Sequence, residues 1–297
     1  MRASYGTLQL LGLKPGGYPF TPKTAFLLVG EGCIGSCTFC PQAQGIDNKI
    51  SRITWPTISD EDFCHKIKRT FVDRICIQAV RSNTVFEEVI AVLKKVSKTT
   101  ETAVSVSMNI TSNKQAKELF DNGADIVSIA LDCATPKLAN EIKSISFNGT
   151  KDLLIRLSEK HPGKINTHLI AGLGETDREL LELAKKLIDS GVSVSLFAFT
   201  PIKGTPMEEV KPPALSRYRR LQVGMALLRV KRSSDIVFNN DGGIKHLDSF
   251  RDLLKPIDFQ TPGCPGCNRP YYNERPGGTM YHYPNPPNID DILEEIE

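Results

Sequence analysis

Short apolar segments alternate with helical segments along most of this 297-residue chain. Six of the apolar segments predict strands, at 24–30, 73–80, 102–110, 124–132, 164–172 and 192–199, and 235–240 is a candidate seventh strand. The intervening segments have the lengths, polar N-caps and glycine stops of helices. This order predicts right-handed βαβ units and a parallel sheet.

The central strands each carry one apolar and one polar face. In 102–110, for example, Val104 and Val106 alternate with Ser105 and Ser107. Strands buried on both faces would be continuously apolar, so a polar lumen inside a ring of helices explains the pattern better. We predict an α/β fold, a complete or partial parallel (β/α) TIM-type barrel, with its active site at the carboxyl ends of the strands. An open sheet with an exposed face remains the alternative.

The predicted organisation has three parts. Residues 1–23 form an N-terminal extension, 24–240 the barrel, and 241–297 a C-terminal extension that carries a Cys-Pro-Gly-Cys segment. A formal net charge of +3 without a basic run disfavours nucleic acid as a partner. No run approaches the ~20 apolar residues of a membrane span, and the first residues lack the features of a signal peptide. We therefore expect a cytoplasmic protein.

Three of the eight cysteines lie on one loop, directly after the first predicted strand. Cys33, Cys37 and Cys40 form a C-x-x-x-C-x-x-C pattern in GEGCIGSCTFCPQ. Three thiolates can hold three irons of a [4Fe-4S] cluster and leave the fourth iron open, as a catalytic metal requires. A structural zinc site would need a fourth protein ligand, and the loop offers none.

This loop resembles the cluster-binding motif of the radical S-adenosylmethionine (SAM) superfamily. CPQ after the third cysteine, HLIAGLGE at 168–175 and PIKGTPM at 201–207 are similar to stretches of biotin synthase-like members. The resemblance covers roughly residues 25–240. It implies a SAM-binding [4Fe-4S] cluster on Cys33, Cys37 and Cys40, and cleavage of SAM to a 5′-deoxyadenosyl radical.

The resemblance also implies roles for individual residues. The backbone around Phe39 would contact adenine, and Asp132 would bind ribose or substrate. Asp132 could instead initiate the following helix, and His168 could be an ordinary lumen histidine. The residues expected to bind the cofactor are Phe39, Asp132, His168, Ile170, Gly172 and Glu175.

Four further cysteines are candidates for a second iron–sulfur cluster. Cys76 faces the predicted lumen, Cys133 follows the fourth strand, and Cys264 and Cys267 lie in the C-terminal extension. If that extension folds over a barrel mouth, the four thiols could meet and bind an auxiliary cluster, most simply a [4Fe-4S] cluster. Cys133 could equally be a plain buried thiol, and Cys64 is expected to pack within a helix.

The segments CPGCNRPYYNERPGG at 264–278 and SRITWP at 51–56 resemble the two-component, archaeal-type lipoyl synthases. This resemblance implies sulfur insertion into an octanoyl chain on a carrier protein, with the auxiliary cluster consumed as the sulfur source. It further implies three partners: an octanoylated lipoyl-carrier domain, a second radical SAM subunit, and a reductant such as ferredoxin or flavodoxin. Phe197 and Phe199 could line the acyl slot or simply pack the barrel end. Biotin synthase-like insertion into another substrate and a non-catalytic electron carrier are the alternatives.

Overall fold

A computed structural model describes residues 1–17, 20–46, 48–143, 145–269, 274 and 277–296. Its main sheet has seven strands in the order β1-β2-β5-β6-β7-β8-β9. The strands are β1 Arg2–Ala3, β2 Thr24–Val29, β5 Arg74–Ala79, β6 Ala103–Ser107, β7 Ile126–Ser128, β8 Ile165–Ala171 and β9 Ser193–Ala198. All neighbours are parallel except β1, which pairs antiparallel with β2.

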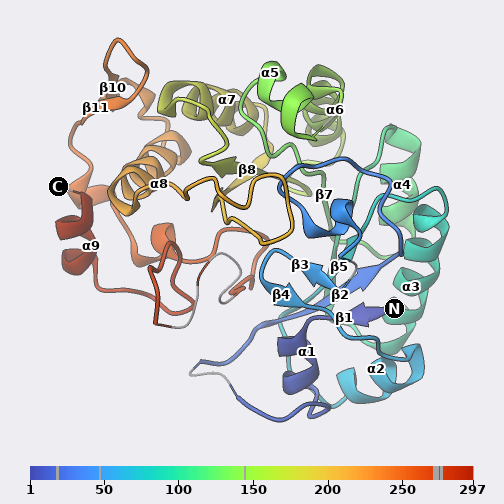
Figure 1. The fold of residues 1–297 in the computed structure, drawn as a ribbon. Helices are drawn as coiled ribbons and strands as arrows, with labels where there is room; N and C mark the ends of the chain where they lie inside the picture. Colours follow the sequence, from blue (N-terminus) through green and yellow to red (C-terminus); the bar gives the residue numbers. More distant parts are fainter. Residues whose placement is uncertain (18–19, 47, 144, 270–273, 275–276, 297) are drawn as a thin grey trace.

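The sheet curves into a partial barrel with helices on its outer side (Figure 1). Within the described residues, no ladder joins β9 to β1, so the barrel does not close. The predicted α/β barrel is confirmed in its partial form. The helices between the strands are α2 Asp60–Ile67, α3 Val85–Thr99, α4 Asn113–Asp121, the short α5 Pro136–Leu138, the π-helix η2 Ala139–Lys143, α6 Phe147–Lys160 and α7 Asp177–Asp189.

Local sequence explains where these helices begin. Ser59, Ser112 and Thr176 each accept a hydrogen bond from a backbone N–H in the first turn of the helix that follows. At α7 the capping is reciprocal, because the Glu179 carboxylate also accepts from the N–H of Thr176. The apolar faces of these helices pack against Ala25, Leu27 and the other outward residues of the strands.

The segments outside the barrel pack closely on it. Helix α1 (Tyr5–Leu10) lies beside β2, where the hydroxyl of Thr7 accepts from the N–H of Phe26. The hairpin of β3 (Lys49–Ile50) and β4 (Ile53–Thr54) leads to Trp55, which packs on the inner face of β2 with Phe26. The 3₁₀ turn η1 (Pro41–Gln44) lies between the cysteine loop and this hairpin.

The candidate seventh barrel strand is wrong. Residues of 235–240 form β10 (Ile236–Phe238), which pairs antiparallel with β11 (Ile244–Leu247) in a separate two-stranded sheet. The reason is the turn at Asp241–Gly243, which returns the chain at once and leaves no crossover helix for a parallel strand. The 3₁₀ turn η3 (Ser233–Asp235) precedes this hairpin.

The C-terminal segment wraps around α8 (Leu215–Arg229), as Figure 1 shows in orange and red. The buried Arg219 guanidinium holds it there: Nη1 donates to the carbonyl of Tyr281 (2.7 Å), Nη2 to that of Met280 (2.6 Å), and Nε pairs with Glu295 (2.6 Å). Glu295 lies in α9 (Ile289–Ile296), and two 3₁₀ turns, η4 (Arg251–Leu253) and η5 (Pro256–Phe259), precede the cysteine pair. This anchoring fixes the course of the segment that carries Cys264 and Cys267.

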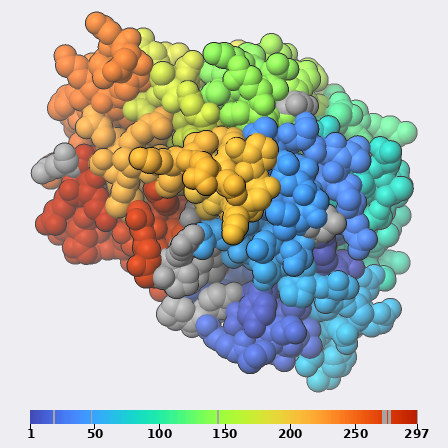
Figure 2. Space-filling view, in the orientation of Figure 1, coloured from blue at the N-terminus to red at the C-terminus, as the bar shows by residue number. Residues whose placement is uncertain are grey.

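Distant parts of the sequence also meet on the face seen in Figure 2, where the segment after β9, in gold, lies against blue residues of the first third of the chain. A Cβ added at Gly204 would lie 3.2 Å from Cδ1 of Ile46. No helix in the described part of the chain is long and apolar enough to cross a bilayer.

Candidate active site

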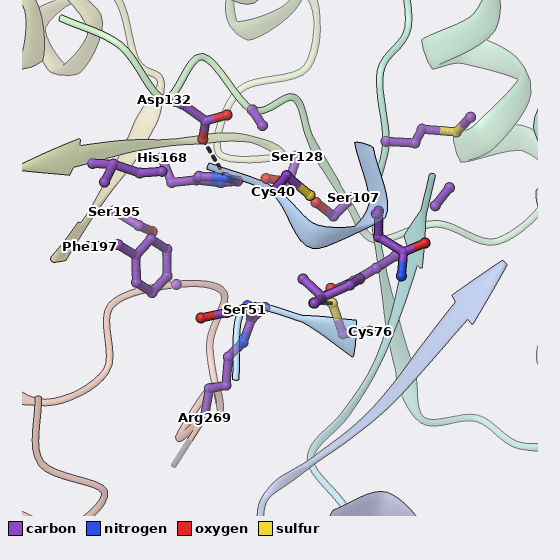
Figure 3. A pocket seen from close by; sticks show the side chains of 18 of the residues that line it. Cys40, Ser51, Cys76, Ser107, Ser128, Asp132, His168, Ser195, Phe197 and Arg269 are labelled. Atoms are coloured by element: carbon purple, nitrogen blue, oxygen red, sulfur yellow. Dashed lines mark hydrogen bonds and ion pairs between the residues drawn. The ribbon is translucent and has the colours of Figure 1, made fainter. Parts of the chain in front are cut away.

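A cavity of about 280 Å³ occupies the interior of the barrel (Figure 3). Its polar wall is the one that strand alternation predicts, because a period of two places every second side chain on the inner face. The inward residues of β5 to β9 and of the loops that follow them include Cys76, Gln78, Ser105, Ser107, Asn109, Ser128, Asp132, Asn166, His168 and Ser195. A cavity with this many polar groups can orient a polar cofactor.

The loop with Cys33, Cys37 and Cys40 lies at the carboxyl end of β2, and all three thiols line the cavity. Backbone hydrogen bonds shape the loop: the N–H of Cys40 donates to the carbonyl of Cys37 (3.2 Å), and that of Thr38 donates to the carbonyl of Ile142 (2.8 Å). The N–H of Gly35 donates to Sγ of Cys33 at 3.4 Å. The three sulfurs therefore face one space at the end of the barrel where catalysis is expected.

Burial raises the pKa of Cys37 to about 12 and also raises that of Cys40. The Lys143 ammonium opposes this effect at Cys37, whereas backbone N–H donors after the loop oppose it at Cys40. A thiol must lose its proton to bind iron, so metal loading of this loop releases protons.

Asp132, Lys143 and His168 form a polar cluster at the same end of the cavity. Oδ2 of Asp132 lies 2.6 Å from Nζ of Lys143, and Oδ1 lies 2.9 Å from Nε2 of His168, as the dashed line in Figure 3 shows for the imidazole. Burial raises the pKa of Asp132, but Lys143 and His168 outweigh it and hold the pKa below its usual range. Asp132 is therefore a carboxylate at neutral pH.

The helix-initiating alternative for Asp132 is wrong, because the N-cap of α5 is Thr135, whose hydroxyl accepts from the N–H of Leu138. Asp132 instead has a positive φ of 63°. Such a conformation is uncommon for a residue other than glycine, and it turns the carboxylate into the cavity.

The expected adenosine-pocket residues divide into two groups. Phe39 and Ile170 line the cavity. Gly172 and Glu175 lie behind them, in the turn after β8: the Glu175 carboxylate accepts from the backbone N–H groups of Gly172 (2.8 Å) and Leu173 (2.9 Å). Glu175 thus shapes the turn and does not face the cavity.

Cys264 and Cys267 reach the opposite end of the barrel. Their segment is held at the amino ends of β2 and β5, where Oγ1 of Thr24 donates to the carbonyl of Gly266 (3.0 Å) and Nε of Arg74 donates to that of Pro265 (2.9 Å). Both cysteines line the same cavity as Cys76, whose side chain points toward them from β5. The tail therefore closes the barrel end opposite Cys33, Cys37 and Cys40.

Polar groups surround this second set of thiols. Nδ2 of Asn166 lies 3.8 Å from Sγ of Cys264, and the pKa of the Cys76 thiol, raised by burial, is lowered in part by the nearby Arg269 guanidinium. The hydroxyl of Ser105 neighbours Cys76 and Cys264. Among the described residues, neither Oγ of Ser105 nor Oδ1 of Asn166 has a hydrogen-bond partner of normal geometry. Buried polar atoms left this way indicate room for a further group beside the thiols.

Cys133 does not join this set. Its side chain is fully buried among apolar core residues outside the cavity, and the ionisable groups that act on its thiol are those of Asp132, Lys143, Cys37 and Glu175. Cys133 lies beyond β7, which ends at Ser128, and its N–H donates to the carbonyl of Leu131 (2.8 Å). The four-cysteine set reduces to Cys76, Cys264 and Cys267. Cys64 lies half-buried in α2 against the core.

The loop of Cys33, Cys37 and Cys40 carries the thiol donors of an iron–sulfur cluster. Among the described residues, no three His, Cys, Asp or Glu side chains converge closely enough to hold one metal ion. A cluster does not require such convergence, because each thiolate binds a different iron. Cys33, Cys37 and Cys40 offer one thiol for each of three irons.

Several residues of the cavity were not predicted from the sequence. Lys143 enters it from the π-helix η2, and Arg74 and Arg269 enter it beside the second set of thiols. The π-helix is the one signal that could have suggested Lys143, since π-bulges often occur at functional sites, but it is visible only in the structure. Part of the sequence 264–278 that resembles lipoyl synthases, residues 270–273, 275 and 276, lies outside the described residues.

The profile of the radical SAM superfamily matches residues 27–187, more than half of the chain. The match contains the three-cysteine loop and the turn after β8. This chain belongs to the radical SAM superfamily. Membership implies the [4Fe-4S] cluster and SAM, and the loop of Cys33, Cys37 and Cys40 supplies the matching thiols.

Curated relatives are distant from this radical SAM protein. A biotin synthase of Clostridium beijerinckii is 24% identical over 77% of the chain and 75% of its own length. A biotin synthase of Vesicomyosocius okutanii is 22% identical over 74% and 69%, and a lipoyl synthase of Alkaliphilus metalliredigens is 24% identical over 79% and 83%. The chain is thus a radical SAM enzyme that is distantly similar to both groups.

Solved structures support the fold. The FeFe-hydrogenase maturase HydG from Carboxydothermus hydrogenoformans has a TM-score of 0.56 at 13% identity, covering 92% of this chain and 66% of its own. Streptococcus suis SuiB, solved with its precursor peptide SuiA, has a TM-score of 0.54 at 16% identity, covering 71% of this chain and 47% of its own. The chain spans about half to two thirds of the length of these structures. At such identities the likeness concerns the partial barrel alone.

Proposed function

We propose that this protein is a sulfur-inserting enzyme of the lipoyl synthase type, related to the two-component lipoyl synthases. Its substrate would be an octanoyl chain attached to a lysine of a carrier protein. The observation that carries the proposal is the placement of two three-thiol groups at opposite ends of one cavity: Cys33, Cys37 and Cys40 at one end, and Cys76, Cys264 and Cys267 at the other.

When bound, the first cluster with SAM would supply a 5′-deoxyadenosyl radical that removes a hydrogen atom from the substrate, and the second cluster would supply sulfur. The protein's own groups would orient the reactants. Phe39 and Ile170 would contact the adenosine, and the ionised Asp132 would accept hydrogen bonds from ribose through the oxygens that His168 and Lys143 now contact.

The middle of the cavity suits an acyl chain. Phe26, Val80, Met108 and Phe197 are among its lining residues, and none of these side chains has a hydrogen-bonding group. A chain lying along them could present one carbon to both ends, so that the carbon that loses its hydrogen atom toward the first end would receive sulfur from the second. Phe199 also lines the cavity, close to the loop after β9, and so belongs to the mouth of the slot.

Three partners belong to this proposal: an octanoylated lipoyl-carrier domain, a second radical SAM subunit that modifies the other carbon, and a small reductant such as ferredoxin or flavodoxin. Ile34, which is 62% exposed within the first cysteine loop, gives a reductant direct access to that end of the barrel. No part of the proposal involves nucleic acid or a membrane.

A single-turnover assay tests the function. The protein is reconstituted with iron and sulfide under anaerobic conditions, reduced, and mixed with SAM and an octanoyl-lysyl peptide, with and without a candidate partner subunit. We expect about eight irons per chain, formation of 5′-deoxyadenosine, and a peptide heavier by the mass of added sulfur. SAM cleavage without any thiolated peptide under either condition would remove the lipoyl assignment.

Insertion of sulfur into dethiobiotin is a second candidate, favoured by the biotin synthase relatives and by the position of Cys76 on β5. The inward residues on β6 and β8 beside it are Ser105 and Asn166, and not cysteines. Replacing the peptide by dethiobiotin in the same assay separates the two candidates. A non-catalytic electron carrier would give neither product and would not cleave SAM.

A further inference from the structure

The turn that follows β8 has a backbone that most residues could not adopt. Gly172 and Gly174 have φ values of 103° and 114°, in the region that favours glycine. A Cβ at Gly172 would lie 2.9 Å from Cδ of Pro213, which immediately precedes α8. The turn is thus pressed against the start of α8, and it directly follows Ile170, whose side chain lines the cavity.

Only one side chain on α8 reaches the acidic groups of this turn among the described contacts, and it is Arg217. Its Nη2 donates to the carbonyl of Glu175 (3.0 Å) and to Oε1 of Glu175 (2.9 Å), and its Nε donates to Oδ1 of Asp177 (2.7 Å). Because the Glu175 carboxylate also accepts from Gly172 and Leu173, the guanidinium acts on the turn through one buried carboxylate.

Asp177, which Arg217 contacts, also binds the hairpin of β10 and β11 that follows α8. Its Oδ2 accepts from the N–H of Ile244 in β11 at 3.0 Å. Asp177 is also the first residue of α7, where a carboxylate is favoured by the helix dipole. Arg217 therefore joins the turn, the start of α7 and the start of α8 with one planar group.

This geometry does not suit a lysine. The guanidinium presents several N–H donors in a rigid fork, so a single group can satisfy both carboxylates at once. Without it, the fully buried side chain of Glu175 would have only the backbone N–H groups of Gly172 and Leu173 as described hydrogen-bond partners. The turn would then lose a restraint close to Ile170, whose side chain lines the cavity.

We propose that Arg217 is a positioning residue for SAM: it holds the turn of residues 172–175 behind the cavity wall and so fixes the side chain of Ile170, which would contact the adenosine. The proposal rests on radical SAM chemistry and does not depend on which substrate receives the sulfur. It predicts a selective effect on SAM affinity. The iron content of the first cluster should not change, since Arg217 contacts none of Cys33, Cys37 and Cys40 in the described structure.

The test compares Arg217→Met with Arg220→Met. Arg220 lies three residues after Arg217. Arg220 lies in the same helix and donates to the carbonyls of Ile244 (2.7 Å) and Lys245 (3.1 Å), without touching Glu175 or Asp177. Reconstituted proteins are titrated with SAM while the EPR signal of the reduced cluster is followed, and 5′-deoxyadenosine formation is measured at low and saturating SAM.

For Arg217→Met we expect the Kd of SAM to rise about 10- to 100-fold, with a cleavage rate at saturating SAM within about twofold of the parent protein. Arg220→Met should keep the parent Kd. Equal SAM affinity in all three proteins would overturn the proposal, as would loss of iron from Arg217→Met. If Arg217→Met does not fold, Arg217→Lys decides, because an unchanged Kd in that variant would show that the fork is not required.

Discussion

The two ends of the barrel cavity collect thiols in different ways. At the carboxyl end, Cys33, Cys37 and Cys40 come from one loop of eight residues after β2. At the amino end, Cys76 on β5 meets Cys264 and Cys267, which lie about 190 residues later in the chain. The first group can form once a single loop folds, whereas the second requires the completed barrel and the anchored tail.

This difference has a functional consequence. A cluster on the loop of Cys33, Cys37 and Cys40 would be held by residues that directly follow β2. Its position would therefore not depend on the tail. A cluster at the other end would depend on hydrogen bonds from Thr24 and Arg74 to the backbone of 265–266. The second site should therefore be the one that can be opened, emptied and refilled while the barrel stays folded.

The largest effect is expected at the contiguous loop. Cys37→Ala should abolish SAM cleavage, by at least about 10³-fold, because the radical chemistry belongs to the bound cofactors and cannot proceed without them. Iron per chain should fall from about eight to about four. Measuring 5′-deoxyadenosine and iron together checks this; a variant that still cleaves SAM would refute the assignment of the loop.

Removal of the tail thiols should separate the two ends. Cys264→Ala/Cys267→Ala is expected to retain SAM cleavage within about threefold, to bind about four irons, and to give no thiolated peptide. Cys64→Ala is the matched control, since Cys64 lies in α2 against the core and outside the cavity. If the double variant also loses SAM cleavage, the tail is structural and the two-ended site is wrong.

Weakening the tail anchor should have an intermediate effect. Arg74→Met removes the donor to Pro265 and the ion pair with Asp125 (2.8 Å), which we expect to cost about 1–3 kcal/mol of local stability. The second end should then lose iron faster on chelator treatment than the first, with SAM cleavage unchanged. Equal rates of iron loss from both ends would contradict the proposed dependence on the anchor.

The smallest effect is expected at Cys133. Cys133→Ala should lower the free energy of unfolding by about 1 kcal/mol, through the lost contacts of a small buried side chain. The iron content should equal that of the parent protein, because the thiol lies outside the cavity. Loss of about four irons in this variant would restore Cys133 to the ligand set and exclude the three-thiol arrangement.

The sequence by itself determined the barrel and its polar interior, because strand period, helix caps and chain order are local signals. The cluster-binding role of the Cys33–Cys40 loop could be predicted for the same reason, because the cysteine spacing and the preceding strand lie in one short segment. The inward direction of Cys76 also followed from simple alternation, whereas Asp132 lies beyond the end of β7 with a positive φ. The hairpin at 236–247 was misread because an apolar run does not reveal its pairing partner.

Only the tertiary structure decided which distant residues meet. It separated Cys133 from the other candidate ligands, brought the tail to the amino ends of β2 and β5, and placed Lys143 and Arg217 beside the residues they contact. Such contacts depend on how α8 and the wrapped tail pack on the barrel. Packing of that kind is set by the summed burial and hydrogen bonding of many residues, and no single segment of the sequence encodes it.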